Sequence, residues 1–189
     1  KEDIDAVKRV GSSWIGIFLG TSELSLKHKF HVGHSEALKM IKEGIDYAKN
    51  LGLKVRFTPE DATRTDSNYL NEVVQLAEES GADRISIADT VGTALPSQMK
   101  EIVRRVRDNI NLPIHVHCHN DYGMAIANGL AGYEGGAHLI DVTVNGLGER
   151  TGITSLAPFV VALKRLYDVD KEWDLELLPS LSRTVEKYS

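Results

Sequence analysis

The chain has 189 residues, of which 42% are hydrophobic and 26% charged, and its formal net charge is -5. This composition can build a sizeable core, which argues against a disordered chain, and the acidic balance argues against nucleic-acid binding. One cysteine rules out an intrachain disulfide framework, and no apolar run approaches the roughly 18–20 residues of a membrane helix, so we expect a cytoplasmic protein with no membrane partner.

Short β-rich runs alternate with longer segments of helical spacing. Hydrophobic periodicity and glycines such as Gly52 and Gly81 set the boundaries, and Asp66 or Ser67 can cap one helix. Strand–helix–strand units of this kind require parallel strands with right-handed crossovers, which predicts an α/β fold. In chain order, the predicted elements are strand 14–19, helix 35–51, strand 54–58, helix 66–80, strand 84–88, helix 96–107, strand 114–119, helix 124–134, strand 139–144, and helices 157–167 and 181–188.

Two architectures are compatible with this alternation. An open doubly wound sheet needs only five strands, so the length favours it. Polar clusters follow nearly every predicted strand, and a (β/α)8 barrel places its active-site groups in such a ring, whereas an open sheet concentrates them at one switch point. The first strand–helix turn has no G-x-G-x-x-G pattern, which weakens a dinucleotide-binding interpretation.

Three histidines alternate at the end of the fourth predicted strand. Because alternate residues of a strand share a face, His115, His117 and His119 point one way and Cys118 the other. Two imidazoles at i and i+2 near a strand end can bind one divalent cation. The alternative is a group of partly buried histidines bonded to their neighbours, and we expect this structural role for His115, the deepest. Cys118 is expected to be a small core residue.

A second group of polar residues, Arg56, Thr58 and Glu60, shares one face of the second predicted strand. An enclosed arginine requires a carboxylate, which an oxo-acid substrate could supply in bidentate form. The alternative is an internal ion pair of Arg56 with Glu60 or Asp89. At the next strand end the Thr90 hydroxyl can hold a carboxylate while Asp89 orders the loop, or the two residues simply cap a helix.

Two loops add further polar groups. Residues 145–152 are glycine-rich, which permits positive φ and close approach of the backbone to a ligand. No Gly-Lys-Ser/Thr follows, so this is not a Walker A loop. Lys27, His28, Lys29 and His31 cluster after the first predicted strand; they could bind an anion, but we expect a solvated loop.

Together these segments resemble the family of isopropylmalate and homocitrate synthases, with hydroxymethylglutaryl-CoA lyase and some aldolases as wider relatives. The order and spacing of the motifs agree across essentially the whole chain. The resemblance implies a (β/α)8 barrel with a divalent metal ion at its C-terminal mouth. The matching segments are residues 20–22, 57–66, 89–92, 117–123 with 127–128, and 145–152.

The resemblance implies roles for individual residues. His117 and His119 are similar to the two metal-binding histidines. Glu60 is similar to the family's active-site glutamate, which helps to position or activate acetyl-CoA, the co-substrate. Thr90 resembles the threonine that holds the oxo-acid carboxylate. The metal is not distinguished among Mg, Mn, Zn and Co, and no residue is assigned to cofactor binding.

One departure bears on the substrate. Isopropylmalate synthases usually end the glycine-rich loop with Gly-Asn, whose asparagine ligates the metal, whereas here Ile153 follows Gly152, as in homocitrate synthases. Arg56 and Thr58 are similar to residues that line the oxo-acid pocket of homocitrate synthases, and an extra guanidinium suits a second carboxylate. The resemblance therefore implies a Claisen-type condensation of acetyl-CoA with a 2-oxo dicarboxylic acid, favouring 2-oxoglutarate to homocitrate, with release of CoA.

Other functions stay open. A Re-citrate synthase would use oxaloacetate, and an isopropylmalate or citramalate synthase would use another 2-oxo acid. A metal-dependent lyase or aldolase of the same barrel family is a different class, as is an inactive fragment. The favoured reaction is that of an acyltransferase of amino-acid biosynthesis, and the resemblance implies a homodimer.

The resemblance also locates the chain within a barrel. The chain enters the family pattern just before the fourth strand, so the expected fold is a partial TIM (β/α)8 barrel with strands 4 to 8. The first three strands, with a further metal carboxylate and its adjacent arginine, are then missing from the chain. Residues 1–189 are expected to be the C-terminal part of one catalytic barrel domain, with residues 168–189 leading towards an absent C-terminal region.

Overall fold

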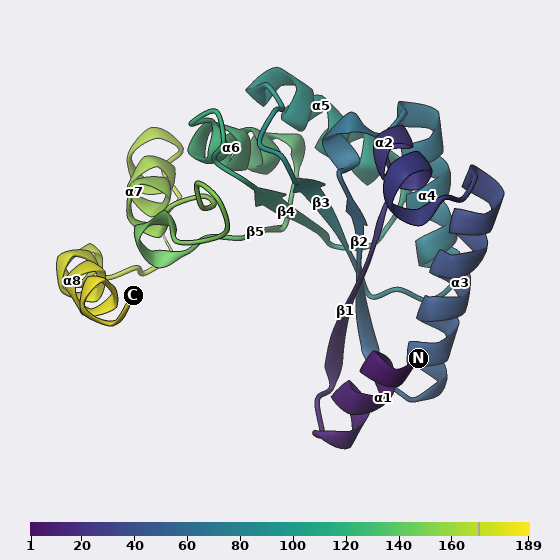
Figure 1. Cartoon of the computed structure of the whole chain (residues 1–189). Helices are drawn as coiled ribbons and strands as arrows, with labels where there is room; N and C mark the ends of the chain where they lie inside the picture. Colours follow the sequence, from purple (N-terminus) through teal and green to yellow (C-terminus); the bar gives the residue numbers. More distant parts are fainter. Residues whose placement is uncertain (170) are drawn as a thin grey trace.

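A computed structural model describes residues 1–169 and 171–189, so one residue of the predicted segment 168–189 lies outside the described residues. Within them, the strands form one parallel sheet in the order β1-β2-β3-β4-β5 (Figure 1). The strands are β1 (Trp14–Gly20), β2 (Lys54–Glu60), β3 (Arg84–Asp89), β4 (Ile114–Cys118) and β5 (Leu139–Ile140).

The consecutive strand order decides between the two architectures. A doubly wound sheet reverses its order at a switch point, whereas right-handed crossovers that always step the same way place every helix on one face. The observed order is therefore that of a (β/α)8 barrel arc and confirms the predicted fold class. None of the described helices is long and apolar enough to cross a bilayer.

Helices connect the strands and cover the outer face of the sheet (Figure 1). The α-helices are α1 (Glu2–Arg9), α2 (Glu23–Ser25), α3 (His34–Asn50), α4 (Ser67–Glu79), α5 (Pro96–Asn109), α6 (Ala125–Gly135), α7 (Leu156–Leu166) and α8 (Leu178–Tyr188). The described residues also form a π-helix, η1 (Leu26–Phe30), and three 3-10 helices, η2 (Ala62–Arg64), η3 (Val144–Gly146) and η4 (Leu175–Leu177).

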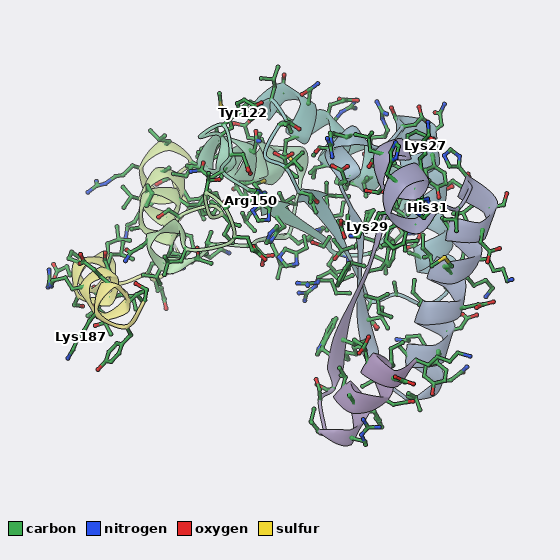
Figure 2. All side chains as sticks on the ribbon, viewed as in Figure 1. Lys27, Lys29, His31, Tyr122, Arg150 and Lys187 are labelled. Atoms are coloured by element: carbon green, nitrogen blue, oxygen red, sulfur yellow. The ribbon has the colours of Figure 1, made fainter. Side chains whose placement is uncertain are left out.

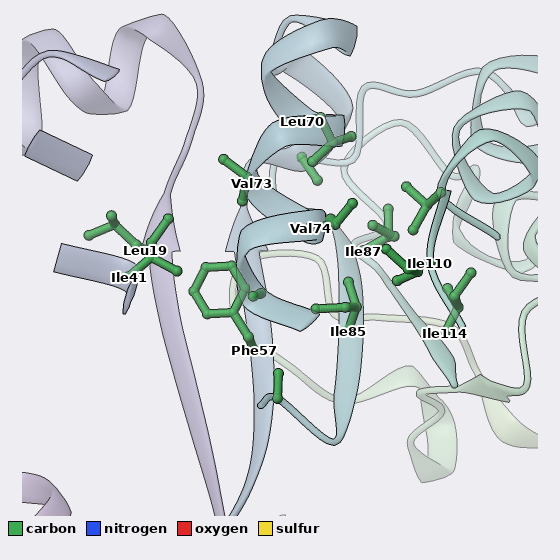
Figure 3. Packing of buried hydrophobic residues seen from close by; sticks show 14 of the residues in the cluster. Leu19, Ile41, Phe57, Leu70, Val73, Val74, Ile85, Ile87, Ile110 and Ile114 are labelled. Atoms are coloured by element: carbon green, nitrogen blue, oxygen red, sulfur yellow. The ribbon is translucent and has the colours of Figure 1, made fainter. Parts of the chain in front are cut away.

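The sequence of β2 shows why the sheet has two different faces. Val55 and Phe57 are fully buried, whereas the side chains that alternate with the buried ones, Arg56, Thr58 and Glu60, are half-buried. Because side chains alternate along a strand, the first set packs under the helices and the second lies on the inner face. The apolar core is therefore on the outer side of the sheet, where strands and helices meet (Figure 3). Its largest members include Phe57, Ile41, Ile45, Ile85, Ile87, Met99 and Ile114.

Two predicted boundaries were wrong in an informative way. The last strand ends at Ile140 rather than at residue 144, because the Thr143 backbone hydrogen-bonds with Thr154, which follows the glycine-rich loop, and with Leu156 at the start of α7. The segment after β1 is not a loop but the short helix α2 followed by η1. Ser22 caps it by accepting from the Ser25 amide, and buried Leu26 anchors it to the core.

Candidate functional site

The end of β4 brings two of the predicted site histidines together. His117 lies within β4, and His119 follows it, bridging to Ile153 of the glycine-rich loop. Their Nε2 atoms are 3.3 Å apart, and the rings meet edge to face with centroids 5.0 Å apart. Both Nε2 atoms are thus directed at one small region on the inner face. Cys118 points the other way and is fully buried, which confirms its expected place in the core.

Asp141, just beyond β5, lies beside this pair. One carboxylate oxygen is 2.7 Å from His115 Nε2, and the other is 2.8 Å from His117 Nδ1. Burial alone would raise the pKa of Asp141, but its hydrogen bonds with the two imidazoles hold this pKa well below its usual range. Asp141 is therefore an ionised acceptor on the inner face. His115 is buried and bonded to it, as expected for a structural histidine.

The electrostatic surroundings of His119 favour a neutral ring. Burial lowers its pKa, and the nearby His117 and Arg150 lower it further. Its Nδ1 is buried and has no hydrogen-bond partner among the described residues. Neutral imidazole is the form that binds metal ions, so His117 and His119 fit a divalent cation as two of its ligands. The described part of the chain contains no group of three metal-binding side chains.

Glu60 ends β2 and is held by a cation from the preceding connection. Lys29 of η1 donates from Nζ to both carboxylate oxygens of Glu60, at 2.8 and 3.0 Å. Figure 2 shows Lys29 close to Lys27 and His31 beside α2. Register pairs Gly20 with Glu60 and Ala88 with His117, so Glu60 and His117 lie on the same face near the strand ends. The predicted loop cluster thus contributes a partner to a predicted site residue.

Thr90 follows β3, and its hydroxyl oxygen already accepts one hydrogen bond. The Asp61 amide donates to Thr90 Oγ1 at 2.8 Å, which leaves the hydroxyl proton available to another acceptor. Asp89 is fully buried and accepts from the Thr93 and Ala94 amides and from the Thr63 hydroxyl. Asp89 therefore orders the loop, as expected, and fixes the position of Thr90.

Arg56 and Thr58 lie on the inner face but deeper than Glu60. Arg56 is in register with Gly16 and Arg84, four residues before Glu60, which is about 13 Å along a strand. Its side chain lines a cavity of about 400 Å3 with Trp14 and Arg84, and its buried Nε has no hydrogen-bond partner among the described residues. The structure does not bring its guanidinium to the histidines.

The two ion pairs considered for Arg56 are also absent among the described residues, since Glu60 pairs with Lys29 and Asp89 accepts from neutral donors. Thr58 lies opposite Phe18 in the layer between Arg56 and Glu60. It is half-buried, so it remains accessible on the inner face.

The glycine-rich loop is fastened over this edge of the sheet by Arg150. Its guanidinium donates to both carboxylate oxygens of Asp121, at 2.7 and 2.9 Å, and to the Thr90 carbonyl at 2.6 Å. Arg150, labelled in Figure 2, has φ 58°, a left-handed backbone conformation. The loop thereby connects the ends of β3 and β4. Ile153 is buried beneath it.

Sequence reasoning did not single out Asp141 or Arg150, and it placed Lys29 in a solvated loop without linking it to Glu60. Asp141 had a detectable signal, because alternation along the fifth predicted strand places residues 139 and 141 on one face. Lys29 is 31 residues from Glu60 in sequence, so only the fold reveals that contact. Arg150 depends on a loop conformation that no periodicity predicts.

A comparison with family models matches residues 1–185 to the family described as HMGL-like. Among curated proteins, the chain is similar to the "Probable 2-isopropylmalate synthase" of Methanopyrus kandleri, at 46% identity over 189 residues, 100% of this chain and 38% of the relative. It is similar to the "Homocitrate synthase AksA" of the same organism, at 46% identity over 99% of this chain and 47% of the relative. It is also similar to the "Homocitrate synthase" of Pyrococcus horikoshii, at 47% identity, covering 100% and 52%.

The chain thus spans about half the length of the curated relatives it matches. Among solved structures, it resembles the HMG-CoA lyase of Bacillus subtilis, with a TM-score of 0.84 and 21% identity, covering 100% of this chain and 67% of that one. It also resembles the carboxyl transferase domain of Rhizobium etli pyruvate carboxylase, with a TM-score of 0.76 and 20% identity, covering 95% and 29%. These structural likenesses support the fold alone.

Proposed function

Because the chain belongs to the HMGL-like family, we propose that the protein containing it condenses acetyl-CoA with a 2-oxo dicarboxylic acid, 2-oxoglutarate in the first place, and releases CoA when water hydrolyses the thioester of the product. Relatives named homocitrate synthase at 46–47% identity over nearly the whole chain support this reaction. In this proposal residues 1–189 form the C-terminal part of one barrel domain. The observation that carries it is the facing pair of Nε2 atoms of His117 and His119, 3.3 Å apart.

In this proposal the inner-face residues have different roles, metal binding and binding of the oxo-acid carboxylate. His117 and His119 hold a divalent cation, which, when bound, polarises the keto carbonyl of the oxo acid as a Lewis acid. Thr90 donates its free hydroxyl proton to the oxo-acid carboxylate, since its oxygen already accepts from the Asp61 amide. Hydrogen bonds of this kind to a charged group are among the stronger ones.

Glu60 helps to position or activate acetyl-CoA in this proposal. A carboxylate can take a proton from the acetyl methyl only when it is held within reach, and the two contacts from Lys29 fix its orientation. Both oxygens keep further lone pairs free, because each accepts only one hydrogen bond from Lys29. Lys29 therefore orients Glu60 without occupying it fully.

One position supports a dicarboxylic substrate over a branched apolar one. Ile153 is buried under the glycine-rich loop and offers no metal-ligating atom. Arg56 has no carboxylate partner among the described residues, but it lies four residues below the layer of His117 and lines the cavity with Trp14 and Arg84, so its position does not support a contact with the distal carboxylate. Oxaloacetate is the shorter alternative oxo acid.

The test is CoA release from acetyl-CoA by the protein that contains this chain, across a panel of 2-oxo acids with and without a divalent metal. We expect release with 2-oxoglutarate or oxaloacetate and dependence on the metal. Release with 2-oxoisovalerate alone would refute the dicarboxylic substrate. Cleavage of an acyl-CoA without any condensation would assign the protein to the lyases instead.

Glu60→Gln is expected to lower kcat by about 100-fold or more, the range for loss of a general acid–base group. Glu134→Gln is a matched control, since Glu134 also pairs with a lysine but on the outer helix α6. We expect Glu134→Gln to keep full activity. Equal losses of kcat in both variants would show that Glu60 is not a catalytic residue of this site.

A further inference from the structure

We infer that Asp141 is a positioning residue that fixes the tautomer of His117, so that the His117 Nε2 lone pair faces His119. The inference rests on the proposed function in taking that lone pair as a metal ligand. The proton on His117 Nδ1 is a property of the chain alone and needs no bound metal ion.

The contact between Asp141 and His117 allows only one position for the proton between them. An ionised carboxylate only accepts hydrogen bonds, so the 2.8 Å contact with His117 requires the proton to be on Nδ1. The other oxygen is engaged by buried His115 at 2.7 Å. The Asp141 amide donates to the Val116 carbonyl at 2.9 Å, which ties its backbone to β4. The carboxylate is thus held at two points and the backbone of Asp141 at a third, so the carboxylate cannot turn away from His117.

The consequence for His117 follows from imidazole chemistry. A neutral ring with its proton on Nδ1 has its lone pair on Nε2, the atom 3.3 Å from His119 Nε2. Carboxylates that accept from the second nitrogen of a ligating histidine fix ring orientation and raise ligand basicity, and their loss weakens metal binding 10–100-fold. Asp141 is placed to do this for His117.

His119 provides an internal contrast. Its Nδ1 is buried with no partner among the described residues, and its Nε2 faces the His117 Nε2 lone pair at 3.3 Å, so in the metal-free chain His119 donates from Nε2–H to His117. The pair is therefore asymmetric, because a carboxylate fixes the tautomer of His117, whereas the lone pair of His117 selects the tautomer of His119. Of the two facing rings, only His117 contacts Asp141 directly, while His115 shares the other carboxylate oxygen and should also respond to a change at Asp141.

The first test is nitrogen NMR of the imidazoles in the metal-free chain at about pH 8, well above the ordinary histidine pKa of about 6.5. We expect His117, identified through His117→Gln, to carry its proton on Nδ1. In Asp141→Ala we expect this preference to be lost, with Nε2–H populated. A His117 that carries its proton on Nε2 in the unaltered chain overturns the inference before any variant is made.

The second readout is affinity for Zn2+ alone, measured by competition with a chromogenic chelator. Asp141→Ala should weaken binding 10–100-fold. Asp83→Ala is the matched control, because Asp83 has a similarly exposed side chain (30% against 33%) and also accepts two hydrogen bonds. It should leave the His117 tautomer and the affinity unchanged.

The outcomes separate this inference from the proposed function. If the His117 tautomer changes in Asp141→Ala but the protein releases no CoA with any oxo acid, the proposed function fails and the positioning role stands. If CoA release occurs as proposed but the tautomer and the affinity are the same in Asp141→Ala, the positioning role fails. Equal effects of Asp141→Ala and Asp83→Ala on affinity would also overturn it.

Discussion

The outer and inner faces of the sheet are built from alternate residues of the same strands. On the outer face of β2, Val55 and Phe57 are fully buried under helices. On the inner face, Thr58 and Glu60 are half-buried and polar. Apolar burial is the dominant favourable contribution to folding, whereas half-exposed polar groups contribute little to it. Along β2, residues that stabilise the fold and residues of the candidate site are therefore separated by a single position.

The largest expected difference between the faces comes from two phenylalanines on neighbouring strands. Phe57→Ala removes a ring that is 0% exposed, whereas Phe18→Ala removes one that is 66% exposed on the inner face. We expect Phe57→Ala to lower the free energy of unfolding by about 3–5 kcal/mol and Phe18→Ala to change it by about 0.5 kcal/mol or less. Urea unfolding of both variants measures this, and equal losses would mean that the inner face also carries core packing.

The next effect concerns how closely the outer helices pack. A Cβ at Gly135 of α6 would lie 2.8 Å from the Lys100 carbonyl oxygen and 2.9 Å from Val103 Cβ of α5. Overpacking of this kind costs about 1–3 kcal/mol, which should exceed the gain of up to about 1 kcal/mol from replacing a helical glycine. We therefore expect Gly135→Ala to be destabilising in thermal unfolding.

The matched control for that prediction is Gly44→Ala in α3. Its Cβ would meet only Ile17 Cγ2, at 3.8 Å, an ordinary contact. Here the helix-propensity gain is unopposed, so we expect stabilisation by roughly 0.5–1 kcal/mol. If both variants shifted the unfolding temperature upward, close α5–α6 packing would not limit the outer layer.

The smallest expected effect is a pH dependence of the free energy of unfolding, which arises from Asp83, just before β3. Burial acts to raise the pKa of Asp83, but hydrogen bonds from Lys49 and the Val55 amide hold it below its ordinary value. A lowered folded-state pKa adds stability above the unfolded pKa of about 4, and that stability is lost as the pH falls through the folded value. Asp83→Asn should therefore be less stable than the unaltered chain by about 1 kcal/mol or less at pH 6.

This difference should shrink as the pH is lowered below 4, because the unaltered chain then loses the same charge. Denaturant unfolding at several pH values measures it. A gap that stays constant down to acid pH would show that Asp83 contributes through packing and not through its ionised carboxylate.

Most of the outer face was predictable from the sequence because it follows periodicity. The alternation around Phe57 and the capping by Asp66 depend on neighbours in the chain, and the structure has Asp66 accepting from the Asn68 and Tyr69 amides. The close approach of His117 and His119 was predictable for the same reason, since residues two apart in a strand share a face.

The remaining features of the inner face depend on contacts between distant segments. The Asp141 bridge requires β5 to lie beside β4 in one register, and the Lys29–Glu60 pair requires a helical turn in a segment that reads as a charged loop. Alternation places Arg56 on the inner face but does not say where a long side chain turns. In the structure it lines the cavity with Trp14 and Arg84.

The central claim is that His117 and His119 together hold a metal ion on the inner face. Electron spin-echo modulation of Mn2+ bound to the chain tests it most directly, because it detects coordinated imidazole nitrogens. We predict couplings from two imidazoles, with one lost in each of His117→Gln and His119→Gln and both kept in His138→Gln, whose Nδ1 accepts from the Ile114 amide away from the pair. Mn2+ bound without nitrogen couplings, or couplings unchanged in the His117 and His119 variants, would contradict the account.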